Sequence, residues 1–136
     1  MTGDIDANIR AELARARCTY WGGEAVPSFY PSFGPDEVAA YTGADLHWVE
    51  GSENTNWGDE YVADWVESLP LTIDVDNVYW QRKLRILRRG ADLLRGQMAM
   101  TPLDLHTNMG VLAAIRGSEK LCMDLVDRPD VIDQAM

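Results

Sequence analysis

The stretch Met98–Leu121, "MAMTPLDLHTNMGVLAAIRGSEKL", contains the change from strand-like to helix-like sequence that decides the predicted fold. It begins as an apolar run, and Pro102, which cannot donate to a strand ladder, marks where regular pairing should fade. Apolar residues then recur with helical spacing after Asn108. The polar junction Asp104-Leu105-His106-Thr107-Asn108 lies between the two parts. The stretch therefore predicts a buried strand, followed by polar side chains and then a helix.

The segments on either side of this stretch predict further helices. On the carboxyl side we expect helices at 108–116, at 118–126 and from Pro129, which suits the first helical position. On the amino side, Asp76 can cap a helix that Gly96 ends. The apolar residues of that helix recur three or four apart: Trp80, Leu84, Leu87, Ala91 and Leu94. A first helix is expected at 4–17, where Ile5, Ile9 and Leu13 share one stripe.

The middle of the chain predicts shorter elements. Prolines at 27, 31 and 35 break any regular helix, so we expect a short strand at 25–29 and a short helix at 35–42 that Gly43 ends. Alternating residues predict a strand at 45–50, and a loop is expected at 51–61. Residues 62–70 should form at most a short turn of helix. Because strands and helices follow in turn, the predicted fold is α/β with parallel strands, in a single segment over 1–136.

The charged residues are unevenly distributed, and the formal net charge is −10. No Lys or Arg lies between Cys18 and Gln81, whereas twelve Asp and Glu residues do. Several arginines then follow closely, from Arg82 to Arg95. An acidic chain repels phosphate backbones, so nucleic-acid binding is not expected. The arginines are interpreted as a solvated helix face.

Other classes of protein find no support in the composition. No apolar run approaches the ~20 residues that span a bilayer, and the first residues lack the pattern of a signal peptide. The two cysteines, Cys18 and Cys122, are far apart, which favours a reducing cytoplasm over a disulfide framework. With two Cys and two His so dispersed, no metal site is expected. Phosphate-binding loops, nucleophile elbows and zinc-protease motifs are absent from the sequence.

The polar junction admits two interpretations. In the first, Thr107 or Asn108 caps the following helix, and Asp104 and His106 bind loop amides. In the second, these side chains lie at an active site, where a carboxylate orients an imidazole for proton transfer. The helix start would then suit an anionic group.

Residues elsewhere in the chain also have two interpretations. The aromatic residues in the Gly- and Pro-rich loops either line a pocket or cover the edge of the core; they are Trp21, Tyr30 and Trp57. His47, on a predicted strand, is interpreted as a half-buried polar residue. Cys122 is interpreted as a packed thiol between Leu121 and Leu125.

The order of elements from residue 20 onward resembles the uroporphyrinogen decarboxylase superfamily, which includes cobamide-dependent methyltransferases. Its members carry a barrel strand, a short polar turn with Pro, and a helix that ends in an "LRG"-like element. An "E-x-L-x-x-D-L-x-D-x-P-E" run follows. The matching residues here are Ile115, Arg116, Gly117, Glu119, Leu121, Asp124, Leu125, Asp127, Pro129 and Asp130.

The resemblance implies a (β/α)8 TIM barrel, of which 136 residues can form only part, since such a barrel needs at least ~200 residues. It implies either decarboxylation of a porphyrinogen or methyl transfer between a cobamide or methylated substrate and a thiol. The methyltransferase side is favoured, because the arginine-rich substrate loop of the decarboxylases has no counterpart. His106 would then be catalytic and oriented by Asp104, and Asn108, Tyr30 and Trp57 would contact an anionic substrate.

The resemblance also bears on cofactors and partners. The family uses cobamide and zinc, but the zinc ligands lie further downstream than this chain reaches, so no cofactor is expected in this chain. A corrinoid protein is an expected partner. The alternative is a small non-catalytic α/β module that completes its core by oligomerisation. An incomplete barrel leaves strand edges and helix faces unpaired, which predicts that the chain associates with itself or binds a complementary chain.

Overall fold

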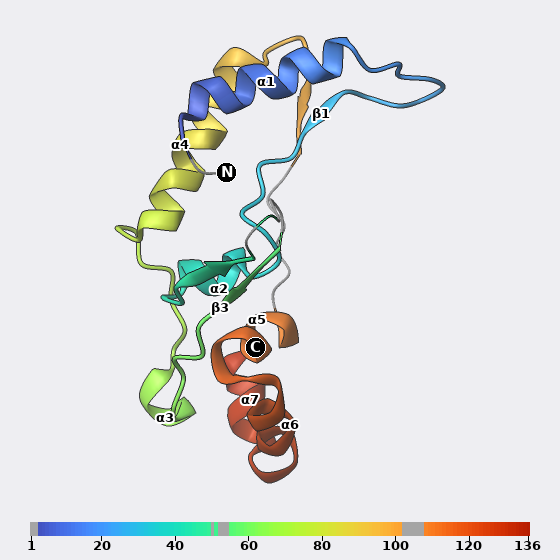
Figure 1. Ribbon diagram of the computed structural model, residues 1–136. Helices are drawn as coiled ribbons and strands as arrows, with labels where there is room; N and C mark the ends of the chain where they lie inside the picture. Colours follow the sequence, from blue (N-terminus) through green and yellow to red (C-terminus); the bar gives the residue numbers. More distant parts are fainter. Residues whose placement is uncertain (1–2, 50, 52–54, 102–107) are drawn as a thin grey trace. The chain divides into compact units, whose positions relative to one another are not determined.

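The computed structural model describes residues 3–49, 51, 55–101 and 108–136. Helices and short strands follow one another along the chain (Figure 1). The elements are α1 (Ile5–Arg17), β1 (Ser28–Phe29), α2 (Glu37–Tyr41), β2 (Leu46–Trp48), β3 (Asn56–Gly58), α3 (Trp65–Ser68), α4 (Val78–Leu93), β4 (Ala99–Met100), α5 (Met109–Arg116), α6 (Ser118–Asp127) and α7 (Pro129–Ala135). The fold therefore mixes helices and strands, as expected of an α/β chain.

The chain divides into two units. The first comprises Met1–Ser32 with Gln81–Asp104, and the second comprises Phe33–Trp80 with Leu105–Met136. The division falls inside α4, whose first turn belongs to the second unit. Among the described residues, no helix is long and apolar enough to cross a membrane.

The first unit contains a two-stranded parallel sheet. β1 pairs with β4 so that Ser28 lies opposite Ala99 and Phe29 opposite Met100. The amide of Ala99 donates to the carbonyl of Pro27 at 2.8 Å, and the amide of Thr101 donates to that of Phe29 at 3.0 Å. The prediction of parallel strands is confirmed for this pair, and the predicted strand at 25–29 is shorter than expected.

Helix α4 packs one face against this sheet. An added Cβ at Gly90 would lie 2.9 Å from the end of the Met100 side chain and 3.5 Å from Phe29, so glycine lets the helix approach the sheet without displacing Met100. Lys83 is buried on the same face, and its ammonium donates to the carbonyl of Pro31. The predicted apolar stripe is therefore rotated, and the buried positions in and just after the helix are Lys83, Ile86, Gly90 and Leu94.

Helix α1 is confirmed almost as predicted. The Asp4 carboxylate caps it and accepts from the amides of Asp6 and Ala7 at 2.8 and 3.2 Å. Ile9 and Ala16 are buried. Asp6 also accepts from the Arg89 guanidinium at 2.8 and 2.5 Å, which ties α1 to α4.

The second unit contains an antiparallel hairpin that the sequence predicted only in part. β2 pairs with β3, with His47 opposite Trp57. The expected loop at 51–61 is therefore wrong at Asn56–Gly58, and the expectation of parallel strands is wrong for this pair. The connection is too short for the crossover that parallel strands require. Gly58 is held by the Asp36 carboxylate, which accepts from its amide at 2.9 Å.

The core of the second unit lies between helices α2, α3, α5, α6 and α7. Trp65 and Ile115 are fully buried, and Ala39 and Val62 are buried beside them. Pro129 occupies the start of α7, as predicted. Cys122 is exposed, so the prediction of a packed thiol is wrong. The face that α6 buries contains Leu121 and Asp124 instead.

Two helix starts also differ from their predictions. α4 begins at Val78, and its cap is Asn77 rather than Asp76, because the Asn77 carbonyl oxygen accepts from the amides of Tyr79 and Trp80 at 2.9 and 3.0 Å. α2 begins at Glu37 rather than at Pro35.

Candidate functional site

The predicted catalytic residues Asp104 and His106 lie outside the described residues. Asn108 is described at the start of α5, where it is exposed and has φ 66° and ψ −138°. Its carbonyl accepts from the amide of Leu112 at 3.1 Å. Its side chain makes no capping hydrogen bond with α5. The interpretation in which the Asn108 side chain caps this helix is therefore wrong.

Two of the three aromatic candidates, Tyr30 and Trp57, are exposed. Tyr30 follows β1 and is 46% exposed, and Trp57 in β3 is 50% exposed. Tyr30 belongs to the first unit, whereas Trp57 and Asn108 belong to the second. Trp21 is partly buried, and its indole donates to the carbonyl of Ala16 at 2.8 Å, which is the contact of a residue that covers the core edge.

The hairpin of the second unit assembles an imidazole, a carboxylate and an indole. His47 Nε2 lies 2.8 Å from Asp59 Oδ1, and both side chains are about half exposed. The His47 ring stacks on that of Trp57, with centroids 5.9 Å apart and an interplanar angle of 25°. Because strand neighbours face each other across the ladder, the register of β2 and β3 creates this group.

This arrangement can bind and move a proton. When the imidazole is neutral and Nε2–H donates to Asp59, Nδ1 carries the lone pair and can accept a proton. The sequence predicts a half-buried His47, and its side chain is about half exposed. The sequence does not connect His47 with Asp59, twelve residues later. Only a predicted hairpin over 45–59, with the correct strand register, would have brought His47 and Asp59 together.

A second polar group is buried and joins three helices. The indole of Trp65 donates to Asp124 Oδ2 at 2.7 Å. Arg116 Nε and Nη2 donate to the two oxygens of the same carboxylate at 2.7 and 3.2 Å. Arg116 Nη1 also donates to the carbonyls of Val62 and Ala63 at 3.1 and 2.5 Å. We refer to Arg116, Asp124 and Trp65 as the buried triad.

Hydrogen bonding dominates the electrostatics of the buried triad. The hydrogen bond from Arg116 lowers the pKa of Asp124, and burial opposes this effect. The same bond raises the pKa of Arg116. The triad thus keeps Arg116 and Asp124 charged inside the unit, and hydrogen bonds join its three side chains. This is the behaviour of a structural group.

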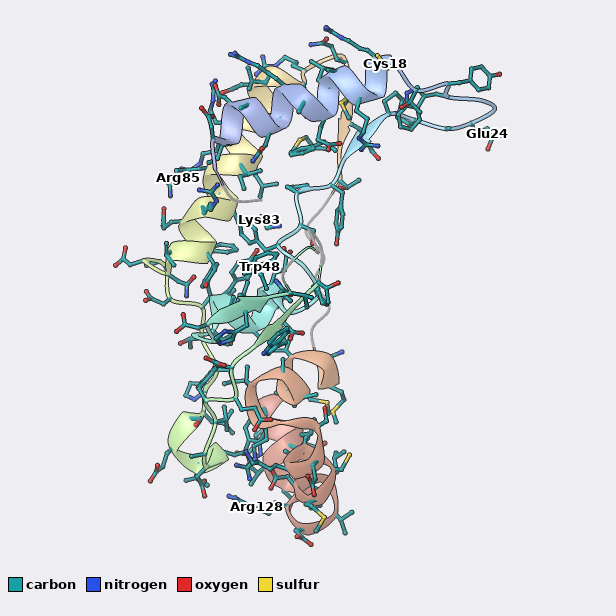
Figure 2. The ribbon with its side chains drawn as sticks, viewed as in Figure 1. Cys18, Glu24, Trp48, Lys83, Arg85 and Arg128 are labelled. Atoms are coloured by element: carbon teal, nitrogen blue, oxygen red, sulfur yellow. The ribbon has the colours of Figure 1, made fainter. Side chains whose placement is uncertain are left out.

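Two further ion pairs hold the segment before Trp65 to the helices that follow. Lys120 Nζ donates to Glu60 at 2.6 Å, and Arg128 lies 3.5 Å from Asp64. The pKa of Asp64 is lowered first by the amide of Val66 and then by Arg128. Figure 2 shows Arg128 among the carboxyl-terminal helices. Lys120 and Arg128 therefore hold segment 60–65 to these helices.

The stability of the second unit should decrease in acid because of Asp124. Since its pKa is lowered on folding, its contribution is present above the unfolded pKa, ~3.9, and is lost as the pH falls through the lower folded value. We expect the free energy of unfolding, measured by urea titration, to fall below about pH 5. The Asp124→Asn variant should show a shallower fall; an identical pH profile would contradict this assignment.

The described residues offer no metal site. Within 3–49, 51, 55–101 and 108–136, no three His, Cys, Asp or Glu side chains lie close enough together to hold a metal ion. His47 and Asp59 supply two donors, and no third donor joins them there.

No protein-family model, curated protein or solved structure matches the chain.

Proposed function

We propose that the chain is a segment of a (β/α)8 barrel of the uroporphyrinogen decarboxylase type, from an enzyme closer to the methyltransferases than to the decarboxylases. The observation that supports it best is the parallel pairing of β1 and β4 with α4 packed on them. Parallel neighbours require a crossover connection, and the repeated unit of such a barrel is a strand followed by a helix.

The geometry of the first unit suits this arrangement. Two strands of two residues cannot form a stable sheet by themselves, and parallel sheets are normally covered by helices. α4 supplies one such cover through Gly90. β4 leads through 102–107 to α5, which follows the same alternation of strand and helix. Further strands at the edges of β1 and β4 would complete the sheet.

The residues that carry the resemblance have structural roles that suit a shared scaffold. Arg116 and Asp124 form the buried ion pair. Gly117 has φ 90° and lies against the Glu60 carboxylate, where a side chain would clash. Pro129 starts α7. These contacts support the proposal by giving the three positions a role in the scaffold, and the proposed chemistry lies at other positions.

In the proposed function, His106 moves a proton and Asp104 orients its ring, while Asn108 contacts the substrate. The substrate is an anionic small molecule, because the first amides of α5 follow the junction directly. The reaction is transfer of a methyl group to a thiol, with a cobamide carried by a corrinoid partner protein. The cobamide supplies the methyl group, and this chain supplies binding and proton transfer.

The test is to assay the protein encoded by the complete reading frame that contains these residues. We expect demethylation of methylcobalamin in the presence of a small thiol, and no decarboxylation of uroporphyrinogen. His106→Ala should lower the rate by about 10²–10⁴-fold with little change in melting temperature.

His47→Ala provides the comparison, since the chain holds two histidines and His47 is also paired with a carboxylate. Loss of activity in His47→Ala with full activity in His106→Ala would place proton transfer on the hairpin and overturn the proposal. Absence of both reactions in the complete protein would favour the non-catalytic module.

A further inference from the structure

The two units carry opposite net charge. Met1–Ser32 with Gln81–Asp104 hold nine Lys and Arg residues and six Asp and Glu residues. The ranges of the second unit hold three and sixteen. The formal net charge of −10 is therefore the sum of a basic unit and a strongly acidic one. Oppositely charged surfaces on one chain allow copies of that chain to recognise each other.

Part of the basic charge of α4 lies on its exposed face. Arg85 and Arg88 of the helix are exposed, as is Arg95 two residues after its end, and we refer to the three as the arginine stripe. The buried Lys83 lies on the other face of the helix, and Figure 2 shows Lys83 and Arg85 extending from opposite sides of α4. The stripe therefore faces away from the parallel sheet.

Part of the arginine stripe has no carboxylate beside it. Arg95 lies 3.7 Å from Asp92, and the neighbouring Arg89 is bonded to Asp6. Over 3–49, 51, 55–101 and 108–136, no carboxylate lies within 4.0 Å of Arg85 or Arg88. Two adjacent guanidinium groups thus keep their full charge and their hydrogen-bond donors.

Helix α7 presents a matching pair of carboxylates. Asp130 and Asp133 are both exposed on α7, whose buried residue is Ile132. In the part of the chain that the structure describes, neither forms an ion pair. The two arginines on α4 are three residues apart, and so are the two aspartates on α7. The charges on each helix are therefore spaced by about 4.5 Å along its axis. Two ion pairs can therefore form at once between the two helices.

We infer that Arg85 and Arg88 of one copy bind Asp130 and Asp133 of a second copy of this chain. The two surfaces differ, so the contact is of the head-to-tail kind and can continue from copy to copy. Exposed ion pairs are individually weak, so association should require low ionic strength. The inference does not depend on the proposed activity.

The test is sedimentation equilibrium at concentrations of roughly tens to hundreds of micromolar. We expect the weight-average mass to rise with concentration at about 10 mM salt, where charges act over ~30 Å, and to equal that of a monomer at about 1 M, where they act over ~3 Å. Arg85→Glu/Arg88→Glu and Asp130→Lys/Asp133→Lys should each be monomeric at low salt. An equimolar mixture of the two variants should associate again, because the charges are exchanged.

A matched control makes the same change of charge on α1. Arg10 and Arg15 are exposed, and Arg10→Glu/Arg15→Glu should still associate. Four results would overturn the inference: a monomeric wild type at low salt, association that survives in the Arg85→Glu/Arg88→Glu variant, a mixture of variants that stays monomeric, or equal loss in the α1 control. A sedimentation coefficient that changes with salt at constant monomer mass would instead indicate a contact within one chain.

Discussion

Replacing Arg116 with alanine should lower the free energy of unfolding by about 3–5 kcal/mol. The change leaves Asp124, which is 7% exposed, as a buried carboxylate without its cation. It also removes the donor that serves the carbonyls of Val62 and Ala63. Removing one partner of a buried ion pair costs far more than removing a surface pair, because the remaining charge is out of water.

Urea-induced unfolding followed by circular dichroism measures this effect. Arg15→Ala is the control, since Arg15 forms an exposed pair with Glu12 and its removal should change the free energy of unfolding far less. Arg116→Lys should fall between the two, because lysine keeps the charge but not the two parallel hydrogen bonds. Equal effects of Arg116→Ala and Arg15→Ala would show that the buried triad does not stabilise the unit.

Replacing Trp65 with alanine should have a similarly large effect, about 3–5 kcal/mol. Trp65 is fully buried in the core of the second unit, so the change leaves a cavity. It also takes away the indole donor of Asp124. Trp65→Phe separates these contributions: it keeps most of the apolar volume, and loss of the hydrogen bond to a charged group should cost about 1.5–3 kcal/mol.

Trp57→Ala is the matched control for Trp65, because Trp57 is half exposed and its removal should change the free energy of unfolding by about 0.5 kcal/mol. The effects of Arg116→Ala and Trp65→Ala should not add, since both side chains bind the same carboxylate. Strict additivity of the two losses would show that the three side chains do not act as one group.

The candidate site was less predictable than the helices. The polar junction was recognised from its position between a strand and a helix, and of its proposed residues Asn108 alone is described. The pair of His47 and Asp59 could not be found from spacing, because twelve residues separate them and only the β2–β3 register joins them. Side chains paired across a ladder depend on hydrogen bonds between distant segments, which local sequence patterns do not contain.

The sequence alone determined the helices α1, α4, α5, α6 and α7, because caps, prolines, glycines and a period of 3.6 act within a few residues. Only the tertiary structure decided which faces those helices bury. Lys83 is inside because a carbonyl accepts from its ammonium, and Asp124 is inside because Arg116 and Trp65 bind it. Cys122 is outside because α6 turns its Asp124 face inward. A buried polar group is stable only where distant partners meet it, so its burial depends on the whole unit.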